Sequence, residues 1–245
     1  MNTRGNHALI MTAVTALAVF ALLIRLGLWQ LDRAQEKKVR AADYETRFAA
    51  PPVHLDGATR HSFADLRWRR VSAAGRYIAP VILLDNRTRR GRAGFEVLTF
   101  YVIDKTKTVL VNRGWVPGDP DRSRLPDVGI PAAPAVLSGF AGPPPVTGIA
   151  LNETAALIEN LVPDVDRVQR VTIEDFAAYY GVALEPFIVY LDESAPAGYN
   201  RQWNPPGDGS AKHHAYAIQW FSMAAILVVI MVALAVRRKN MGVII

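Results

Sequence analysis

The sequence predicts a membrane protein in which two transmembrane helices, one near each end, flank a strand-rich α+β extramembrane domain. Three observations lead to this fold class. A long uncharged apolar stretch lies near each end, the middle has the composition of a water-soluble domain, and the middle divides into short runs with strand character. The apolar fraction of 51% therefore averages unlike parts of the chain. There is no cysteine, which excludes disulfides and thiolate metal sites.

The first transmembrane helix is predicted over residues 8–31. Residues 8–24 carry no charge, and after Arg25 the apolar character resumes through Leu31, which gives the ~20 residues that a bilayer requires. A cleavable signal peptide is the alternative, because residues 16–18 resemble a small-residue cleavage site. The apolar residues run on well past that point, which favours an uncleaved anchor.

The second transmembrane helix is predicted over residues 213–236, followed by a tail at 237–245 that begins Arg-Arg-Lys. Basic residues beside a membrane span mark the cytoplasmic side. The basic residues after the first helix, taken alone, favour the opposite orientation, but the rule loses force for long translocated segments. An even number of spans puts both termini on one side. We therefore expect both termini in the cytoplasm and the domain at 32–212 outside.

The domain is expected to be a small barrel or sandwich. The first helix continues in polar form to residue 48 and ends before Pro51-Pro52, because proline lacks an amide hydrogen and restricts the residue before it. Residues 115–131 are rich in proline and glycine and predict an ordered loop. A helix is predicted at 172–180, from the capping-box-like Thr172 to Gly181. Further elements are a helix at 153–161, a hairpin connection at 104–107, and strands at 69–78, 81–84, 95–103, 108–112, 136–140 and 186–191.

The net charge is +6, and arginines gather between Arg60 and Arg92, in runs such as residues 67–70 and 87–90. A basic cluster with an interleaved tryptophan is one pattern of nucleic-acid binding. The alternative is a solvated strand edge, or a position near anionic lipid headgroups. For a domain tethered to a membrane at both ends the second interpretation is favoured, so we expect membrane lipid and no nucleic acid as a partner.

No enzyme is predicted. The chain lacks a hydrolase elbow, a phosphate-binding glycine loop, a metalloprotease helix and a dinucleotide fingerprint, and its acidic residues are scattered. Chemistry-bearing residues gather instead at one end of each transmembrane helix. In a two-span hairpin these ends meet at the same bilayer surface. They carry Arg25, Trp29, Gln30 and Arg33 on the first helix, and His213, His214, Tyr216 and Trp220 on the second.

These residues suit a haem. His213, Tyr216 and Trp220 are spaced by three and four residues and share one helical face. Imidazole ligates haem iron, aromatic rings pack against a porphyrin, and Arg25, Arg33 and Lys212 suit its two propionates. The alternative is an ordinary membrane interface, with an aromatic belt, an arginine that reaches the headgroups and a histidine that only hydrogen-bonds. Spacing alone does not decide between the two.

Three blocks of sequence resemble the Surfeit locus protein 1 family. On the first helix stands Leu26-Gly-x-Trp29-Gln30-x-x-Arg33, followed by Lys37. Residues 109–117, Val-Leu-Val-Asn-Arg-Gly-Trp-Val-Pro, form the most recognisable block. The second helix carries His213-x-x-Tyr216-Ala-x-x-Trp220-Phe221. The resemblance covers nearly the whole chain. It departs from the family at Lys212, where asparagine is common, and along residues 151–166.

The resemblance implies a bacterial plasma-membrane assembly factor for haem-copper cytochrome c oxidase rather than an enzyme. It implies transient binding of haem a, received from haem A synthase, and help with its insertion into oxidase subunit I. His213 is the implied iron ligand, with His214 as a substitute or second ligand. Two alternatives are a structural partner that docks on subunit I without touching haem, and a membrane-anchored envelope enzyme.

The block at residues 112–115 has two interpretations. Gly114 directly follows a strand and allows a turn that no larger residue fits. Arg113 and Trp115 either brace that turn against the domain or face the oxidase, and the first interpretation is favoured.

Overall fold

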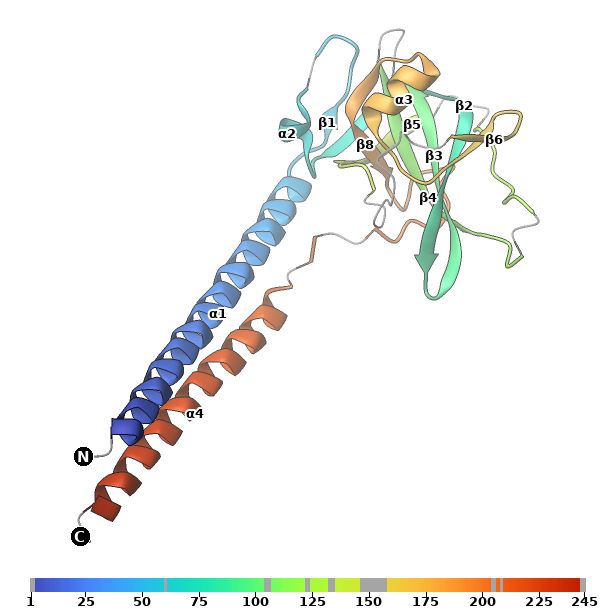
Figure 1. The fold of residues 1–245 in the computed structure, drawn as a ribbon. Coiled ribbons are helices and arrows are strands. Elements are labelled where there is room, and N and C mark those ends of the chain that lie inside the picture. Colours follow the sequence, from blue (N-terminus) through green and yellow to red (C-terminus); the bar gives the residue numbers. More distant parts are fainter. Residues whose placement is uncertain are drawn as a thin grey trace. The chain divides into compact units, whose positions relative to one another are not determined.

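The computed structural model describes residues 3–59, 61–103, 107–121, 124–131, 135–145, 158–203, 206–207 and 209–242. The chain divides into two compact units. One unit combines residues 1–43 with 205–245 and is a pair of long helices. The other, residues 44–204, is a β-barrel domain with short helices (Figure 1).

The helical unit holds most of α1 (Thr3–Ala49) and all of α4 (Ser210–Gly242). By length and composition, both helices are able to cross a membrane, over Ile10–Ala49 and Ser210–Arg238. Only 6% and 11% of their most apolar windows are buried within the protein. A core helix of a water-soluble fold is mostly buried, whereas apolar surface exposed on this scale requires lipid around it. The predicted fold class is confirmed.

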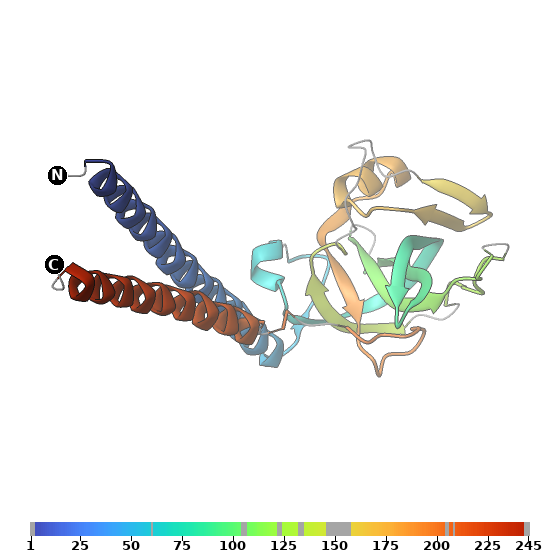
Figure 2. The same cartoon turned by 60° about the horizontal axis from the view of Figure 1, so that its bottom comes forward.

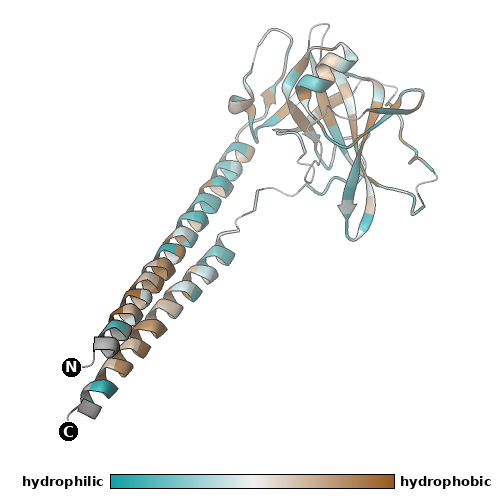
Figure 3. Ribbon diagram, in the orientation of Figure 1, coloured by the Kyte–Doolittle hydropathy of each residue, from teal (hydrophilic) through white to brown (hydrophobic). Residues whose placement is uncertain are grey.

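Helix α1 changes character along its length. Its N-terminal half is apolar and its C-terminal half is hydrophilic (Figure 3), as the predicted polar continuation to residue 48 requires. The helix ends at Ala49, two residues before Pro51. Pro51 disfavours helical geometry at the residue before it, and neither Pro51 nor Pro52 has an amide hydrogen to continue the ladder.

Small residues occupy the buried positions of the two helices. Buried positions recur every seventh residue on each helix, which is the spacing of a left-handed antiparallel pair. Small side chains at such positions let the backbones approach closely in lipid. Figure 2 shows the helices closest near the start of α4 and apart at the two chain termini. These buried positions are Gly27, Ala34 and Ala41 on α1, and Ser210, Ala217 and Ala224 on α4.

Five strands of the domain close into a barrel, so the barrel alternative is confirmed. The ring runs β2–β3–β4–β8–β5 and back to β2. The long β2 makes closure possible, because residues 70–75 pair with β5 while residues 76–89 pair with β3. The strands are β2 (Arg70–Arg89), β3 (Arg92–Val102), β4 (Thr108–Pro117), β5 (Ala135–Gly142) and β8 (Leu184–Leu191).

Among the described residues, three short strands and two short helices are added to the five-stranded barrel. Strand β1 (Val53–His54) pairs in parallel with the start of β2. Strand β7 (Val165–Val168) pairs in parallel with β2 farther along, and β6 (Glu159–Val162) pairs antiparallel with β7. Helix α2 (Phe63–Leu66) follows β1, and α3 (Ile173–Tyr180) precedes β8. None of β1, α2 or β7 is among the predicted elements.

Side chains alternate between two faces of the barrel wall, as strand geometry requires. On β4, Val109 and Val111 join a buried cluster built from all five strands, whose largest members are Tyr77, Tyr101 and Phe187. Leu110 points the other way and packs in a second cluster with Phe176 of α3. The barrel is therefore apolar inside and covered outside by α3.

A chain of aromatic contacts ties the barrel to both of its connecting segments. Phe48, in the last turn of α1, packs edge-on against Phe140 of β5, with ring centroids 5.8 Å apart. Phe140 stacks on Tyr190 of β8 at 5.1 Å, and Tyr190 meets Trp203 at 5.0 Å. The segment that enters the barrel and the segment that leaves it are thus fastened to the same part of its wall.

Two strand predictions were too short. The runs at 69–78 and 81–84 belong to one strand, because the pairing with β3 only shifts register between Ile78 and Val81. A bulge of this kind accommodates Pro80, which has no amide hydrogen to give to the ladder. The predicted loop at 115–131 begins later than expected, since β4 runs on to Pro117.

The helix predicted at 153–161 is wrong where it can be compared. Residues 159–161 lie in β6, where Glu159 is opposite Arg167 and forms an ion pair with it. Pairing with a strand later in the chain overrides the local helical composition. Residue 158 has no regular secondary structure. Residues 153–157 of that prediction, residues 104–106 of the predicted hairpin connection and residues 243–245 of the tail lie outside the described residues.

The predicted helix at 172–180 is confirmed, with one correction. Gly181 ends α3 in the left-handed conformation, at φ 64°. Thr172 occupies the N-cap position, but its side chain makes no capping hydrogen bond, so the capping box is not formed.

Candidate functional site

All eight predicted site residues lie on α1 and α4, and one pair of them joins the two helices. Nδ1 of His213 lies 2.7 Å from Oε1 of Gln30. This hydrogen bond joins residues 183 positions apart in the sequence and fixes the register of the two helices. The expectation that the two motif-bearing helix ends lie side by side is confirmed.

The contact with Gln30 bears on which ring nitrogen of His213 has a lone pair for a ligand. An amide oxygen only accepts, so a neutral imidazole in this contact would carry its proton on Nδ1. Nε2 then keeps its lone pair. A neutral imidazole whose Nδ1 donates to a fixed oxygen is the form in which histidine binds a metal ion. His213 is half-buried, whereas His214, one position on, is exposed.

Trp220 lies two turns below His213 on the same side of α4 and is also half-buried. Its indole Nε1 is buried and has no hydrogen-bond partner. An indole N–H is a donor that normally finds an acceptor when buried. Tyr216, between the two, is 54% exposed, so it lies at the open margin of the face rather than in its centre.

Trp29 and Arg33 form a second pair, on α1. The guanidinium of Arg33 lies 5.8 Å from the ring centroid of Trp29, and it donates to Glu36 Oε2 at 2.7 Å. Trp29 is 48% exposed, a large amphipathic surface beside Gln30. Arg25 is exposed within the apolar part of the helix. The predicted role of Arg33 as a propionate partner thus competes with an existing ion pair.

Sequence reasoning missed two features of this site. The i,i+3 spacing of Arg33 and Glu36 is a signal for their ion pair. The second feature is a close fit at Gly27, where a Cβ atom would lie 2.5 Å from Cε1 of Phe221. The aromatic ring occupies the space that any side chain at this position would need. A glycine inside an apolar helix is the signal that marks such contacts.

The block at residues 112–115 lies in β4, and its polar side chains hydrogen-bond to other residues of the barrel domain. Asn112 is fully buried, and its Nδ2 donates to Glu96 Oε2 at 2.8 Å while its Oδ1 accepts from the amide of Gly114. Glu96 in turn forms an ion pair with Arg87. Trp115 donates from Nε1 to the carbonyl of Arg87 at 2.8 Å.

Arg113 is 3% exposed and acts as a brace. It donates to the carbonyl oxygens of Ala197 and Gly129, at 2.8 and 2.7 Å, and to the hydroxyl of Thr99. Its guanidinium lies 5.3 Å from the ring of Tyr77 and 5.1 Å from that of Tyr199. Burial lowers the pKa of Arg113 below its ordinary value. These contacts support the bracing interpretation of this block.

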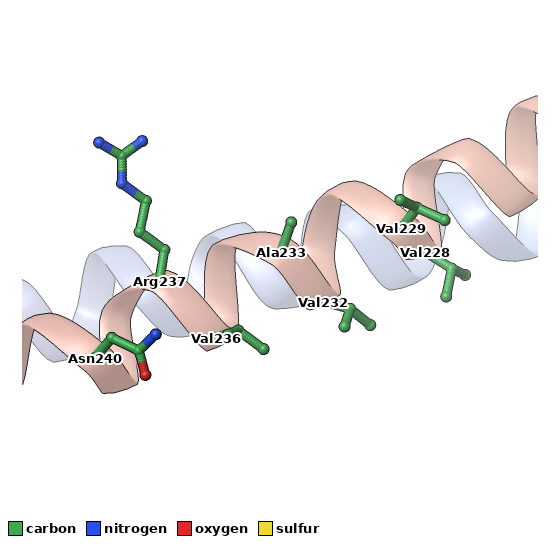
Figure 4. Close-up of a pocket in the computed structure, with 7 residues that line it drawn as sticks. All are labelled: Val228, Val229, Val232, Ala233, Val236, Arg237 and Asn240. Atoms are coloured by element: carbon green, nitrogen blue, oxygen red, sulfur yellow. The ribbon is translucent and has the colours of Figure 1, made fainter.

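Hollows also lie away from these residues. One is a shallow hollow of about 700 Å³ on α4, lined by apolar side chains with Arg237 and Asn240 at one end (Figure 4). No group of three or more histidine, aspartate or glutamate side chains that could hold a metal ion occurs among the residues that the structure describes.

Comparisons with known proteins agree with this architecture. The model of the SURF1 family matches residues 17–225, a range that holds the barrel, most of α1 and the first half of α4. A SURF1-like protein of Rickettsia bellii is 28% identical over 228 residues, which cover 89% of this chain and 88% of the relative. An uncharacterized SURF1-like protein of Mycobacterium bovis is 29% identical over 231 residues, covering 88% of this chain and 77% of the relative.

A SURF1-like protein of Rickettsia felis is 25% identical over 241 residues and covers 94% of this chain and 97% of that relative. The match to the family model includes the whole of the first-helix block, the barrel block and the second-helix block. The chain therefore belongs to the SURF1 family, which is known as a family of oxidase assembly factors.

Proposed function

We propose that this protein is an assembly factor for haem-copper cytochrome c oxidase that binds haem a transiently and aids its insertion into subunit I. Haem a is its cargo, received from haem A synthase. The observation that carries the proposal is the contact between Gln30 and His213, which holds an imidazole with Nε2 available at the junction of two helices. Family membership supports the assembly role.

The surrounding residues suit a large, flat, partly apolar ligand. Trp29 and Tyr216 are about half exposed, so they provide aromatic surface that burial in the fold does not use. Trp220 provides a buried indole N–H that lacks an acceptor. The two propionates of a haem would need cations, and Arg25 and Arg33 are the nearest candidates along α1. His213 is the residue that would hold the haem iron, through Nε2.

The proposed location is a bacterial plasma membrane, with both termini in the cytoplasm and the barrel outside. Arg237, Arg238 and Lys239 directly follow the apolar part of α4, which is the basic pattern of a cytoplasmic helix end. In this orientation the Gln30–His213 contact lies toward the outer surface.

The test is to purify the full chain after co-expression with haem A synthase and to record its optical spectrum. We expect the wild-type protein to retain haem a. His213→Ala should lose at least nine-tenths of it, because one iron ligand is removed, and His214→Ala should lose little. His54→Ala, which changes an exposed histidine of β1, is the matched control.

Full retention of haem a by the double variant His213→Ala, His214→Ala would refute the ligand assignment. Capture of subunit I from detergent-solubilised membranes tests the partner separately. A colourless wild-type protein that still captures subunit I would refute haem binding and remain consistent with a role in oxidase assembly.

The second candidate is a structural partner that docks on subunit I without touching haem. The observation that favours it is the exposed valine face of α4. Val228, Val229, Val232 and Val236 are each between 45% and 66% exposed (Figure 4). β-branched side chains on one face form a stiff surface against which another membrane helix can pack. The colour of the purified protein distinguishes this candidate from the first.

A further inference from the structure

The ribbon formed by β2 and β3 ends in a hairpin that is rich in arginine (Figure 1). Arg89 pairs with Arg92, and the two residues between them form the turn, with φ of 50° at Arg90 and 76° at Gly91. Positive φ at both central residues is the mark of a type I′ turn, which matches the twist of a β-hairpin. The backbone therefore holds these arginines in fixed positions.

A polar hollow of about 510 Å³ lies along this hairpin. Trp115 forms one wall, and the guanidinium of Arg89 lies 6.0 Å from its ring centroid. Asn86 and Thr88 add uncharged hydrogen-bonding side chains. The lining residues are Asn86, Arg87, Thr88, Arg89, Arg90, Glu96, Trp115 and Gln202.

The charges that line the hollow do not cancel. Among the described residues that line it, Glu96 is the single acidic one, and both its carboxylate oxygens are engaged, Oε1 by Arg87 and Oε2 by Asn112. Arg89 donates to three acceptors, all neutral: the carbonyl and side-chain oxygens of Asn200, at 3.1 and 2.6 Å, and the carbonyl of Gln202, at 3.1 Å.

Arg90 donates to the side-chain oxygen of Gln202 at 3.3 Å. Neutral acceptors hold a guanidinium in place without removing its charge. Burial lowers the pKa of Arg89, and the positive charges of Arg90 and Arg87 lower it further, whereas Glu96 raises it. Two fixed guanidinium groups that share a hollow and repel each other are stabilised by an anion between them.

Chain length limits how far this hollow can lie from the start of α4. Gln202, which lines it, precedes Ser210, the first residue of α4, by eight positions. Even a fully extended segment of that length spans no more than about 29 Å. An anionic phospholipid headgroup is therefore one of the ligands to test at this site.

We propose that the hollow formed by Arg89, Arg90, Asn86 and Thr88 is a binding site for a phosphate group. A phosphate has several oxygens that accept from more than one guanidinium and from neutral donors at once, which matches this mixed lining. Its source is either an anionic phospholipid headgroup or a free phosphate ester. The site belongs to the barrel and does not depend on the proposed haem function.

The test uses the full chain in a neutral detergent and measures binding by titration calorimetry. The probes are a short-chain phosphatidylglycerol, the matching phosphatidylcholine, and inorganic phosphate. We expect phosphatidylglycerol to bind, and Arg89→Gln, Arg90→Gln to weaken it at least tenfold, because charge-assisted hydrogen bonds are lost. The control Arg76→Gln, Arg92→Gln removes the same charge from exposed positions outside the hollow and should change affinity less than threefold.

Arg89 also anchors residues 200–202, so Arg90→Gln alone and Thr88→Val provide variants that spare this anchor. Each should weaken binding while leaving the melting temperature unchanged. Binding of inorganic phosphate with the same dependence on Arg90 supports the site and identifies a free phosphate ester as its source. Equal losses in the two double variants, or no binding of either anionic probe, would overturn the proposal.

Discussion

The barrel contains one of the three blocks that resemble the family, and the helix pair contains the other two. Polar groups in the barrel block are hydrogen-bonded within the fold, whereas the helix blocks leave a buried donor without a partner. In the barrel, Arg113 is buried and donates to three acceptors, and Asn112 both donates and accepts. In the helix pair, Trp220 buries an indole N–H without a partner, while Trp29 stays about half exposed.

This difference separates residues that build the fold from residues that remain available to a ligand. A buried network with every member satisfied stabilises one structure and leaves nothing for a partner. Exposed aromatic surface and an unpartnered donor contribute little to folding and are suited to recognition. Changes in the barrel block should therefore lower stability, and changes in the helix block should alter binding.

The largest effect is expected from Arg113→Ala. It leaves the carbonyls of Ala197 and Gly129 without their donor and removes the packing on two tyrosines. The free energy of unfolding of the barrel should fall by about 3–5 kcal/mol. Urea unfolding followed by tryptophan fluorescence measures it, with the exposed Arg76→Ala as the control. Unchanged stability together with lost oxidase assembly would show that Arg113 serves a partner instead.

Next in size is Gly114→Ala, compared with Gly91→Ala. Both glycines have positive φ, of 114° and 76°, but a Cβ at Gly114 would lie 2.8 Å from the carbonyl oxygen of Asn200, whereas nothing lies within 4 Å at Gly91. We expect a loss of about 3 kcal/mol at Gly114 and about 1 kcal/mol at Gly91. The same urea experiment measures both. Equal losses would mean that the conformation alone, and not the contact, restricts this position.

The third prediction concerns alkaline pH. Burial raises the pKa of Tyr77 to about 12, although the charge of Arg113 opposes this shift. In the unfolded chain this tyrosine ionises near pH 10, as an ordinary tyrosine does. Its contribution is therefore complete below about pH 10 and is lost as the pH rises to about 12, by about 2 kcal/mol in total. Burial raises the pKa values of Tyr180 and Tyr190 as well, so they act in the same direction.

Tyr77→Phe should make the fall in stability between pH 10 and 12 shallower, measured as the slope of the urea midpoint against pH. An unchanged slope would assign the effect to the other tyrosines.

The smallest effect on stability is expected from Gln30→Leu. It removes one hydrogen bond, to His213, and should lower stability by about 1 kcal/mol or less. Haem retention should fall severalfold, because His213 loses the acceptor that orients its ring. Gln219→Leu, at an exposed position of α4, is the matched control. A large loss of stability with unchanged haem content would place Gln30 with the residues that build the fold.

The helices were the most predictable part of the fold, because each depends on local sequence. A charge-free stretch and the pair Pro51-Pro52 mark their extent without reference to any other segment. Strand β6 was mistaken for a helix because its conformation comes from pairing with β7, which local composition does not reveal. The division of β2 at Pro80 was likewise mistaken, since a bulge tolerates the proline.

The site was predictable in part for the same reason. An antiparallel pair of membrane helices forces their adjacent ends together, so Gln30 and His213 could be expected to meet. The brace at Arg113 could not be derived, because its acceptors lie 16 and 84 positions away in the sequence. The unpartnered indole of Trp220 likewise depends on packing that no spacing encodes.

The aromatic contacts from Phe48 to Trp203 hold the first and last segments of the barrel domain close together. In the sequence, this domain is inserted between the two long helices. A domain whose ends lie close together can be added to or removed from a scaffold without stretching it. Membrane integration of α1 and α4 therefore places no mechanical demand on the barrel. We expect the helical hairpin to form in the bilayer whether the barrel has folded or not, so the two events can occur in either order during biosynthesis.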